Sequence, residues 1–333
     1  MQLHHARIEG LTRRRFLLAL ALLSSPAIVA AQTARANYRI GVLSQDVAQP
    51  GLLEAFRDGL RERGYVEGKN ITIEVRNGGG RHERMSALAE ELIRFKPDVV
   101  VAVNTPAARA MKRATSTVPI VIMRVADPVK SGLVKSLARP GGNVTGLSFM
   151  PDELGAKGIE LLRQVLPGVS RVAALFHGDN PGAVIVVDEA ERAGTRLGLE
   201  FLRVPVRGAA DLPAAFQSAA RGRAEALFVM DDGAMTKLRT EIVGLAAEHS
   251  LPVVSIYKDF AEAGALIAYG PSLSAMYRRA ADYVDRLLKG ADPGRLPVEQ
   301  PTEFDLIVNL RTARTLRVTI PPAVLLRANR VIE

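Results

Sequence analysis

RIGVLS (39–44), ITIEVR (71–76) and PDVVVAV (97–103) are three short apolar runs, and amphipathic segments at 51–63 and 82–95 separate them. Short runs rich in Val and Ile are typical of buried strands. The separating segments carry apolar residues three and four positions apart, which is the spacing of a helix face that packs on a sheet. The stretch therefore predicts a βαβαβ unit, which is half of a parallel sheet.

The same order returns in the second half of the chain. Its apolar runs are RVAALF (171–176), LEFLRV (199–204) and EALFVM (225–230), and helical segments at 182–196 and 211–221 separate them. Two such units predict an α/β fold of two similar Rossmann-like lobes with parallel sheets. Ligands bind at the carboxyl ends of strands in sheets of this kind, so we expect the functional site in the loops that face the cleft between the lobes.

Further apolar runs indicate where the chain passes between the two lobes. The first crossing is expected at 148–151, the second at ALIAYG (265–270) and the third within the extended stretch 297–310. Three crossings predict a three-strand hinge. The expected lobes are 38–148 plus 266–303, and 149–265 plus 304–333.

Composition fits a soluble globular protein with two cores. The chain has 333 residues, of which 48% are apolar and 24% charged, and this length exceeds the size at which one core keeps growing. It has no cysteine, so neither disulfides nor a lipid-acceptor cysteine are expected. Residues 1–31 carry a net charge of +3, which leaves about +6 of the formal +9. The Lys and Arg residues form no dense run, which argues against nucleic acid as a partner.

The N-terminus has the pattern of an export signal. Three arginines at 13–15 precede a mostly apolar run at 16–30, and small residues at 29–31 follow. This order predicts a cleavable signal peptide at 1–31 and a periplasmic mature protein. The run is too short for a membrane anchor and is broken by Ser and Pro at 24–26. Sec export and twin-arginine export both fit the arginine cluster.

Polar residues follow two strands of the first lobe. Ser44 and Gln45 end the first strand, and Asn104-Thr105-Pro106 follows the third strand and opens a helix. A polar cap residue with proline in the first turn is typical of a helix N-terminus, whose free N–H groups and dipole suit a carboxylate. An ordinary helix cap without a ligand is the alternative.

Matching positions of the later strands carry further candidates. His177 and Asn180 follow RVAALF, Asp232 follows ALFVM, and Tyr257 follows PVVSI. A buried acid could pair with a ligand amine, and Tyr257 could cover an apolar part of the ligand. Asp127 follows the strand PIVIMRVA (119–126) and is either a ligand contact or a turn-former, with a helix-like segment expected after it.

No motif of catalysis is present. The sequence lacks HExxH, GxSxG and the phosphate-binding GxxxxGK(S/T) loop, so we expect no catalytic residue, no metal site and no cofactor. A transcriptional regulator would need a helix-turn-helix ahead of the lobes, and the export signal occupies that place.

Several stretches from Tyr38 to Glu333 resemble the substrate-binding proteins of bacterial ABC transporters, in the group that includes tryptophan- and tyrosine-binding members. The resembling stretches are FRDGLRERGYVEGKNITIE, NTPAARAMKRATSTVPIV, ADPVKSGLVKSLARPGGNVTGLS, YGPSLSAMYRRAADYVDRLLKG, LPVEQPTEFDLIVNL and TIPPAVLLRAN. The resemblance implies a type I periplasmic binding protein that closes on a small ligand and presents it to a membrane permease. We expect the protein to be monomeric.

The resemblance also bears on the ligand. Asp232 matches the amine-binding acid of the family better than Asp231, while His177 and Gly233 depart from the aromatic amino acid binders. An amino acid or a related carboxylate is the expected ligand. A periplasmic sensor subunit that feeds a membrane receptor is the alternative, because the sequence pattern of the two would be the same.

We predict export with cleavage between Ala31 and Gln32, because the charged, apolar and small-residue zones stand in the order that signal peptidase requires. N-terminal sequencing of protein isolated from the periplasm should read from Gln32. Recovery of an intact Met1 form in the membrane fraction would contradict this prediction.

Overall fold

A computed structural model describes residues 37–45, 50–149, 151–230 and 232–333. The predicted signal peptide at 1–31 lies outside these described residues. Within the described ranges, no helix has both the length and the apolar character needed to cross a bilayer.

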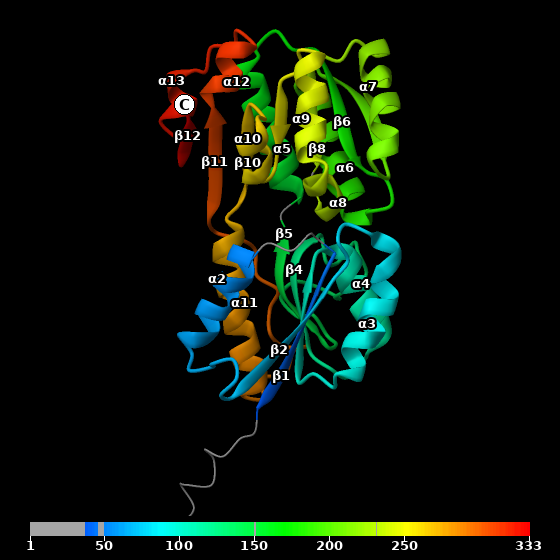
Figure 1. The fold of residues 1–333 in the computed structure, drawn as a ribbon, viewed down its shortest axis with the longest axis vertical. Coiled ribbons are helices and arrows are strands. Elements are labelled where there is room, and N and C mark those ends of the chain that lie inside the picture. Colours follow the sequence, from blue (N-terminus) through cyan, green and yellow to red (C-terminus); the bar gives the residue numbers. More distant parts are fainter. Residues whose placement is uncertain (1–36, 46–49, 150, 231) are drawn as a thin grey trace, which may run out of the picture. The chain divides into compact units, whose positions relative to one another are not determined.

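The first lobe is built on a five-stranded parallel sheet of order β2-β1-β3-β4-β5. Its strands are β1 (Tyr38–Ser44), β2 (Ile71–Asn77), β3 (Val99–Val103), β4 (Ile120–Ala126) and β5 (Val144–Phe149). Helices α2 (Pro50–Arg61) and α11 (Leu273–Leu288) cover one face, while α3 (Met85–Arg94) and α4 (Thr105–Ala114) cover the other (Figure 1). The short helix η2 (His82–Arg84) leads into α3. Burial on both faces explains why β3 is a continuous apolar run and why β4 is apolar except for Arg124.

The second lobe is built on a seven-stranded sheet of order β12-β11-β10-β9-β8-β6-β7. Its strands are β6 (Arg171–His177), β7 (Glu200–Val206), β8 (Ala226–Met230), β9 (Val253–Ser255), β10 (Ile267–Pro271), β11 (Phe304–Asn309) and β12 (Arg330–Ile332). All neighbours are parallel except β10 and β11. The predicted α/β class with two parallel-dominated sheets is confirmed.

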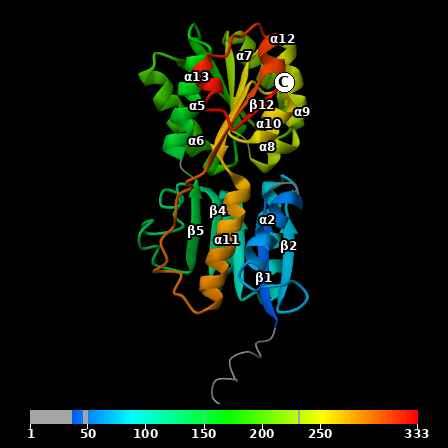
Figure 2. The ribbon, with the colours of Figure 1, turned by 90° about the vertical axis from the view of Figure 1, so that its left-hand side faces the viewer.

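Helices also cover both faces of the second sheet (Figure 2). On one face lie α5 (Pro151–Val165) and α6 (Pro181–Arg196). On the other lie η3 (Ala209–Asp211), α7 (Leu212–Arg221), α8 (Gly233–Lys237), α9 (Arg239–Glu248) and α10 (Lys258–Ala263). The short helices α12 (Leu310–Thr315) and α13 (Pro322–Leu325) precede β12.

The structure differs from the expected course of the chain at two places. Residues 266–271 were expected in the first lobe, but β10 pairs with β9 and β11, so the chain leaves the second sheet only after Pro271. The helix-like segment expected after Asp127 is a series of turns, and residues 127–143 contain no helix. Leu133 and Val134 of this irregular segment are buried against the first sheet. Their burial explains why apolar residues recur in the segment although it forms no helix.

A bulge in β4 shapes the end of the first sheet that leads to the cleft. Between Ile122 and Val125, β4 has one residue more than the facing stretch of β5 from Gly146 to Ser148. Arg124 lies in this bulge with a φ of 54°, a conformation that residues other than glycine rarely adopt. Gly146 has a φ of 129° and passes so close to β4 that a Cβ atom would collide with the backbone of Ile122. A bulge re-aims the side chain that it carries, which here is a buried arginine.

We predict that Gly146→Ala lowers the free energy of unfolding by at least about 2 kcal/mol, because the added methyl group meets backbone and the positive φ is strained for alanine. Urea unfolding monitored by circular dichroism measures the effect. Gly142→Ala is the matched control, since Gly142 is exposed and a Cβ atom there meets nothing within 4 Å. Its effect should stay within about 0.5 kcal/mol; equal effects of the two changes would mean that the bulge is not held by Gly146.

Candidate functional site

A small cavity lies where the carboxyl ends of strands from both sheets meet. Its lining residues are Asn104, Thr105, Arg124, Ala126, Phe149, Asn180, Gly182, Met230, Asp232 and Tyr257. Half of the ten residues predicted from sequence are in this set: Asn104, Thr105, Asn180, Asp232 and Tyr257. The cavity volume is about 20 Å³, which is room for about one water molecule.

Two helix N-termini face this cavity from opposite lobes. The side chain of Asn104 caps α4 by accepting the N–H of Ala107 at 3.4 Å, and that of Asn180 caps α6 by accepting the N–H of Gly182 at 2.9 Å. Thr105 Oγ1 accepts the N–H of Ala126 at 3.2 Å, which fixes its side chain between the helix and β4. Both helices direct the positive ends of their dipoles toward the same space, an arrangement that favours a bound anion.

Arg124 brings a full positive charge to the cavity wall. Its side chain is 6% exposed, and its Nε donates to the hydroxyl of Tyr257 at 3.0 Å, from the first lobe to the second. The guanidinium lies over the Tyr257 ring, 4.2 Å from the centroid. Sequence reasoning missed Arg124, although it is the one charged residue in the apolar run PIVIMRVA. Arginine is almost never fully buried without a partner, so that position was the available signal.

Asp232 is the buried acid of the cavity, at 3% exposure. Its Oδ1 accepts the N–H groups of Ala234 and Met235 at 2.9 and 3.1 Å, which caps α8, and its Oδ2 accepts Asn180 Nδ2 at 2.8 Å. Burial alone would raise the pKa of Asp232, but the hydrogen bonds and charge interactions from His82, His177 and Asn180 outweigh it and hold the pKa below its usual value. The carboxylate is therefore ionised at neutral pH.

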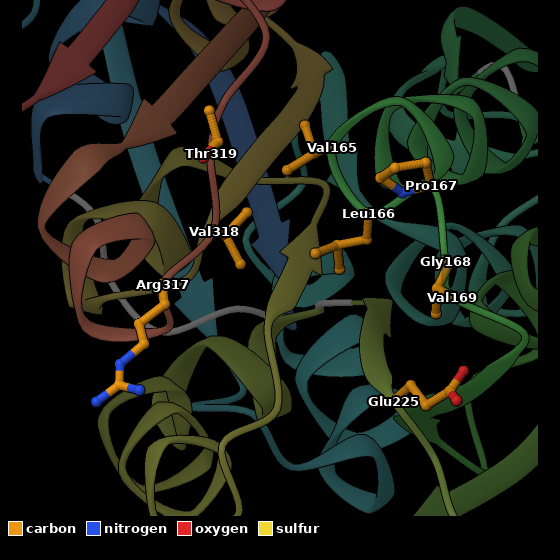
Figure 3. A pocket seen from close by; sticks show the side chains of 9 residues that line it. All are labelled: Val165, Leu166, Pro167, Gly168, Val169, Glu225, Arg317, Val318 and Thr319. Atoms are coloured by element: carbon orange, nitrogen blue, oxygen red, sulfur yellow. The ribbon is translucent and has the colours of Figure 1, made fainter.

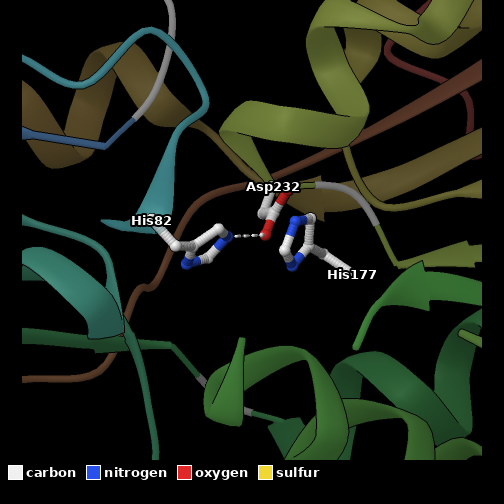
Figure 4. A group of neighbouring side chains, drawn as sticks. All are labelled: His82, His177 and Asp232. Atoms are coloured by element: carbon white, nitrogen blue, oxygen red, sulfur yellow. Dashed lines mark ion pairs between the residues drawn. The ribbon is translucent and has the colours of Figure 1, made fainter. Parts of the chain in front are cut away.

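Two histidines stand beside Asp232, one from each lobe (Figure 4). His82, which begins η2 in the first lobe, places its Nε2 3.4 Å from Asp232 Oδ2. His177, which ends β6 in the second lobe, is buried, and its ring stacks on that of His82 with centroids 4.1 Å apart. Burial lowers the pKa of His177, and the nearby charge of Asp232 opposes this shift. Sequence reasoning gave His82 no role, because nothing in the sequence shows that η2 meets the second lobe.

The remaining predicted residues do not line the cavity. Gln45 is buried behind it, accepts Asn104 Nδ2 at 3.1 Å and lies 3.0 Å from His82 Nε2. Ser44 is buried at the end of β1, and Pro106 is half-buried in the first turn of α4. Asp127 accepts the N–H groups of Val129 and Lys130. Of the two interpretations of Asp127, these contacts describe the turn-former.

A larger groove lies on the second lobe, lined by residues 165–169, Glu225 and residues 317–319 (Figure 3). Its volume is about 470 Å³. Val169 and Glu225 precede β6 and β8, so the groove is at the amino ends of these strands, whereas ligands of parallel sheets bind at the carboxyl ends. The Glu225 carboxylate accepts the N–H groups of Ser170 and Arg171, which joins two loops. The small cavity between the lobes is therefore the better candidate site.

Comparisons with known proteins bear on the class to which this protein belongs. The family model described as ABC transporter substrate binding protein matches residues 40–332. A tyrosine-binding protein of Clostridioides difficile is 28% identical over 278 residues, which are 82% of this chain and 79% of the relative. These matched proteins are solute-binding proteins, not enzymes.

Two solved structures are similar over nearly the whole described chain. A domain from Streptococcus pneumoniae in complex with L-Trp is 27% identical with a TM-score of 0.83, covering 89% of this chain and 100% of that one. A conserved domain protein from Vibrio cholerae is 31% identical with the same TM-score of 0.83 and the same two coverages, 89% and 100%.

We predict that Gly182→Ala forces the two sides of the cavity apart. A Cβ atom on Gly182 of α6 would lie 2.5 Å from Thr105 Oγ1 of α4, and the hydrogen bond to Ala126 holds that hydroxyl in place. Small-angle X-ray scattering should therefore give a larger radius of gyration for the variant than for the unmodified protein.

A second substitution and a control complete this experiment. Thr105→Ala removes the obstructing oxygen, so it should reverse part of the increase caused by Gly182→Ala. Gly244→Ala on α9, where a Cβ atom meets nothing within 4 Å, should leave the radius of gyration unchanged. No increase in Gly182→Ala would show that this contact does not set the distance between the lobes.

Proposed function

The chain belongs to the family of ABC transporter substrate-binding proteins, and we propose that it captures one amino acid in the cavity between its lobes and delivers it to a membrane permease. In this proposal the mature protein acts in the periplasm, as a monomer, and it leaves the amino acid chemically unchanged. The ligand we favour has an aromatic side chain.

The observation that carries the proposal is the pair of opposite charges buried in the lining of one cavity, one from each lobe. Arg124 is 6% exposed and Asp232 is 3% exposed, and both line the same small space. A zwitterion satisfies both: its carboxylate would meet Arg124 and the two helix N-termini, and its amine would meet Asp232. Such contacts are strong in a closed, water-poor site because the local dielectric constant is low.

Apolar residues in the same cavity lining support an aromatic side chain. The rings of Phe149 and Tyr257 are 5.9 Å apart and tilted by 58°, and Met230 also lines the cavity. Flat ligands bind well against tilted rings and thioethers. The tyrosine-binding relative and the relative solved with L-Trp agree with this choice of ligand.

Ligand entry requires the lobes to separate. A cavity of about 20 Å³ is far too small for an amino acid, and Tyr257 and Arg124 close it from opposite lobes. The chain passes between the sheets after β5, after β10 and before β11. In our proposal these three segments form the hinge, and the ligand joins the lobes again when they close over it.

We predict that Asp232→Asn weakens binding of L-Trp or L-Tyr by roughly tenfold to a hundredfold, because a hydrogen bond to a charged group contributes on the order of 1.5 to 3 kcal/mol. The amide keeps the shape of the acid. Binding of a deaminated analogue, such as indole-3-propionate, should change far less, since it has no amine to lose. Isothermal titration calorimetry with both ligands measures the difference.

Two further variants make the result specific. Arg124→Gln should weaken the deaminated analogue and the amino acid alike, because both carry the carboxylate. Asp179→Asn is the matched control. Asp179 lies two residues after the end of β6, but it is exposed and paired with Arg207, so this change should leave binding of both ligands unchanged. Equal losses of both ligands in Asp232→Asn would mean that Asp232 acts only as the cap of α8, and the ligand would then not be an amino acid.

A further inference from the structure

His82 and His177, which the proposed transport function does not use, form a cluster with Asp232, the residue proposed to meet the ligand amine. One possible ligand atom from each of the three side chains lies within 4.8 Å of the other two. His82 comes from the first lobe, and the other two residues come from the second lobe (Figure 4). The cluster therefore spans the cleft.

Gln45 holds the His82 ring beside Asp232. Gln45 Oε1 accepts from Asn104 and its Nε2 donates to Gly80 O, so the Gln45 amide presents an N–H to His82 Nε2 at 3.0 Å. His82 Nε2 also lies 3.4 Å from Asp232 Oδ2, so an imidazole nitrogen of the first lobe and a carboxylate oxygen of the second stand close together at the cleft.

His177 gives a second, independent indication. Its Nδ1 is buried and has no hydrogen-bond partner within the part of the chain that the structure describes, while the residue as a whole is 4% exposed. Buried polar atoms without a partner are rare and require an explanation, such as a bound ion. Figure 4 shows the ring beside the Asp232 carboxylate.

We propose that these three side chains bind one zinc-type divalent ion between the lobes. Two imidazoles and one carboxylate are a donor set that Zn²⁺ prefers, and a water molecule would take the fourth position. Ligand atoms about 2.0 to 2.1 Å from a tetrahedral zinc ion are about 3.4 Å apart. The distance between His82 Nε2 and Asp232 Oδ2 is 3.4 Å, and a rotation of the His177 ring completes the set.

The proposed ion has a structural consequence. It joins a residue of the first lobe to two residues of the second, so it stabilises the arrangement in which the lobes are in contact. This inference goes beyond amino acid binding: it shares Asp232 with the proposed amine contact, but its two histidines take no part in that contact.

The test is calorimetric titration of Zn²⁺ into the mature protein, from residue 32, produced without a histidine tag, treated with chelator and free of amino acids. We expect one ion per chain and no comparable binding of Mg²⁺, which prefers oxygen ligands. His82→Asn and His177→Asn should each weaken zinc binding by more than about a hundredfold. His249→Asn is the matched control, because His249 is exposed just after the end of α9 and stacks on Phe216. The zinc affinity of this variant should equal that of the unmodified protein.

Three results would overturn the proposal: no binding of Zn²⁺ at a ratio of one, Mg²⁺ binding of equal strength, or the same zinc affinity in all three histidine variants. Circular dichroism checks that each variant is folded. If the buried His177→Asn variant is unfolded, His82→Asn decides, since the His82 side chain is 13% exposed and tolerates change better. A failed search for an amino acid ligand would leave the zinc result standing, and the reverse also holds.

Discussion

Burial of opposite charges at the meeting point of two lobes is the constraint on which the rest of the site depends. A charge removed from water is costly unless polar groups or an opposite charge replace the lost hydration. Asp232 receives two backbone N–H groups and the Asn180 amide, and Arg124 receives the Tyr257 hydroxyl and ring. Each partner of Asp232 named here belongs to the second lobe, whereas Tyr257 reaches Arg124 across the cleft. Asp232 therefore keeps these hydrogen bonds whether the lobes are open or closed, whereas Arg124 has its contacts with Tyr257 only when the lobes are closed.

The position of Arg124 shows how backbone geometry far from ideal serves the cavity. A regular strand would turn this side chain toward one of the two helical layers, where a charge has no water and no partner. The bulge with its positive φ directs it to the end of the sheet instead. This conformation is strained and persists only because its surroundings enforce it, and Gly146 supplies the close backbone approach that β5 needs at this point. Gly146 on β5 therefore helps to determine where the charge of Arg124 on the neighbouring strand β4 lies.

The sequence was sufficient for the two βαβαβ units, because strand and helix periodicities are local. It also indicated which polar residues gather near the carboxyl ends of the strands, because these ends follow from the topology of a parallel sheet. Asn104, Asn180, Asp232 and Tyr257 each stand within three residues of the end of a strand, and all four line the cavity. Arg124 and His82 could not be placed in this way. The bulge at Arg124 exists only through pairing with β5, and His82 meets Asp232 only when the lobes approach. The prediction of a helix after Asp127 was wrong for a related reason. The apolar residues of this segment are buried although they lie in turns, and their spacing in the sequence resembles that of a helix.

Asp232 connects the two proposals through the capacity of a single oxygen. A carboxylate oxygen has two lone pairs, and Asn180 already occupies one of those on Oδ2. The amine of an amino acid and the proposed metal ion would both need the remaining one, where His82 Nε2 now lies at 3.4 Å. Two ligands that compete for one lone pair lower each other's binding affinity. This effect is reciprocal, so each ligand must weaken the binding of the other by the same factor. Because the ion also holds the lobes in contact, it would oppose amino acid binding twice, by occupying the acid and by keeping the entrance closed.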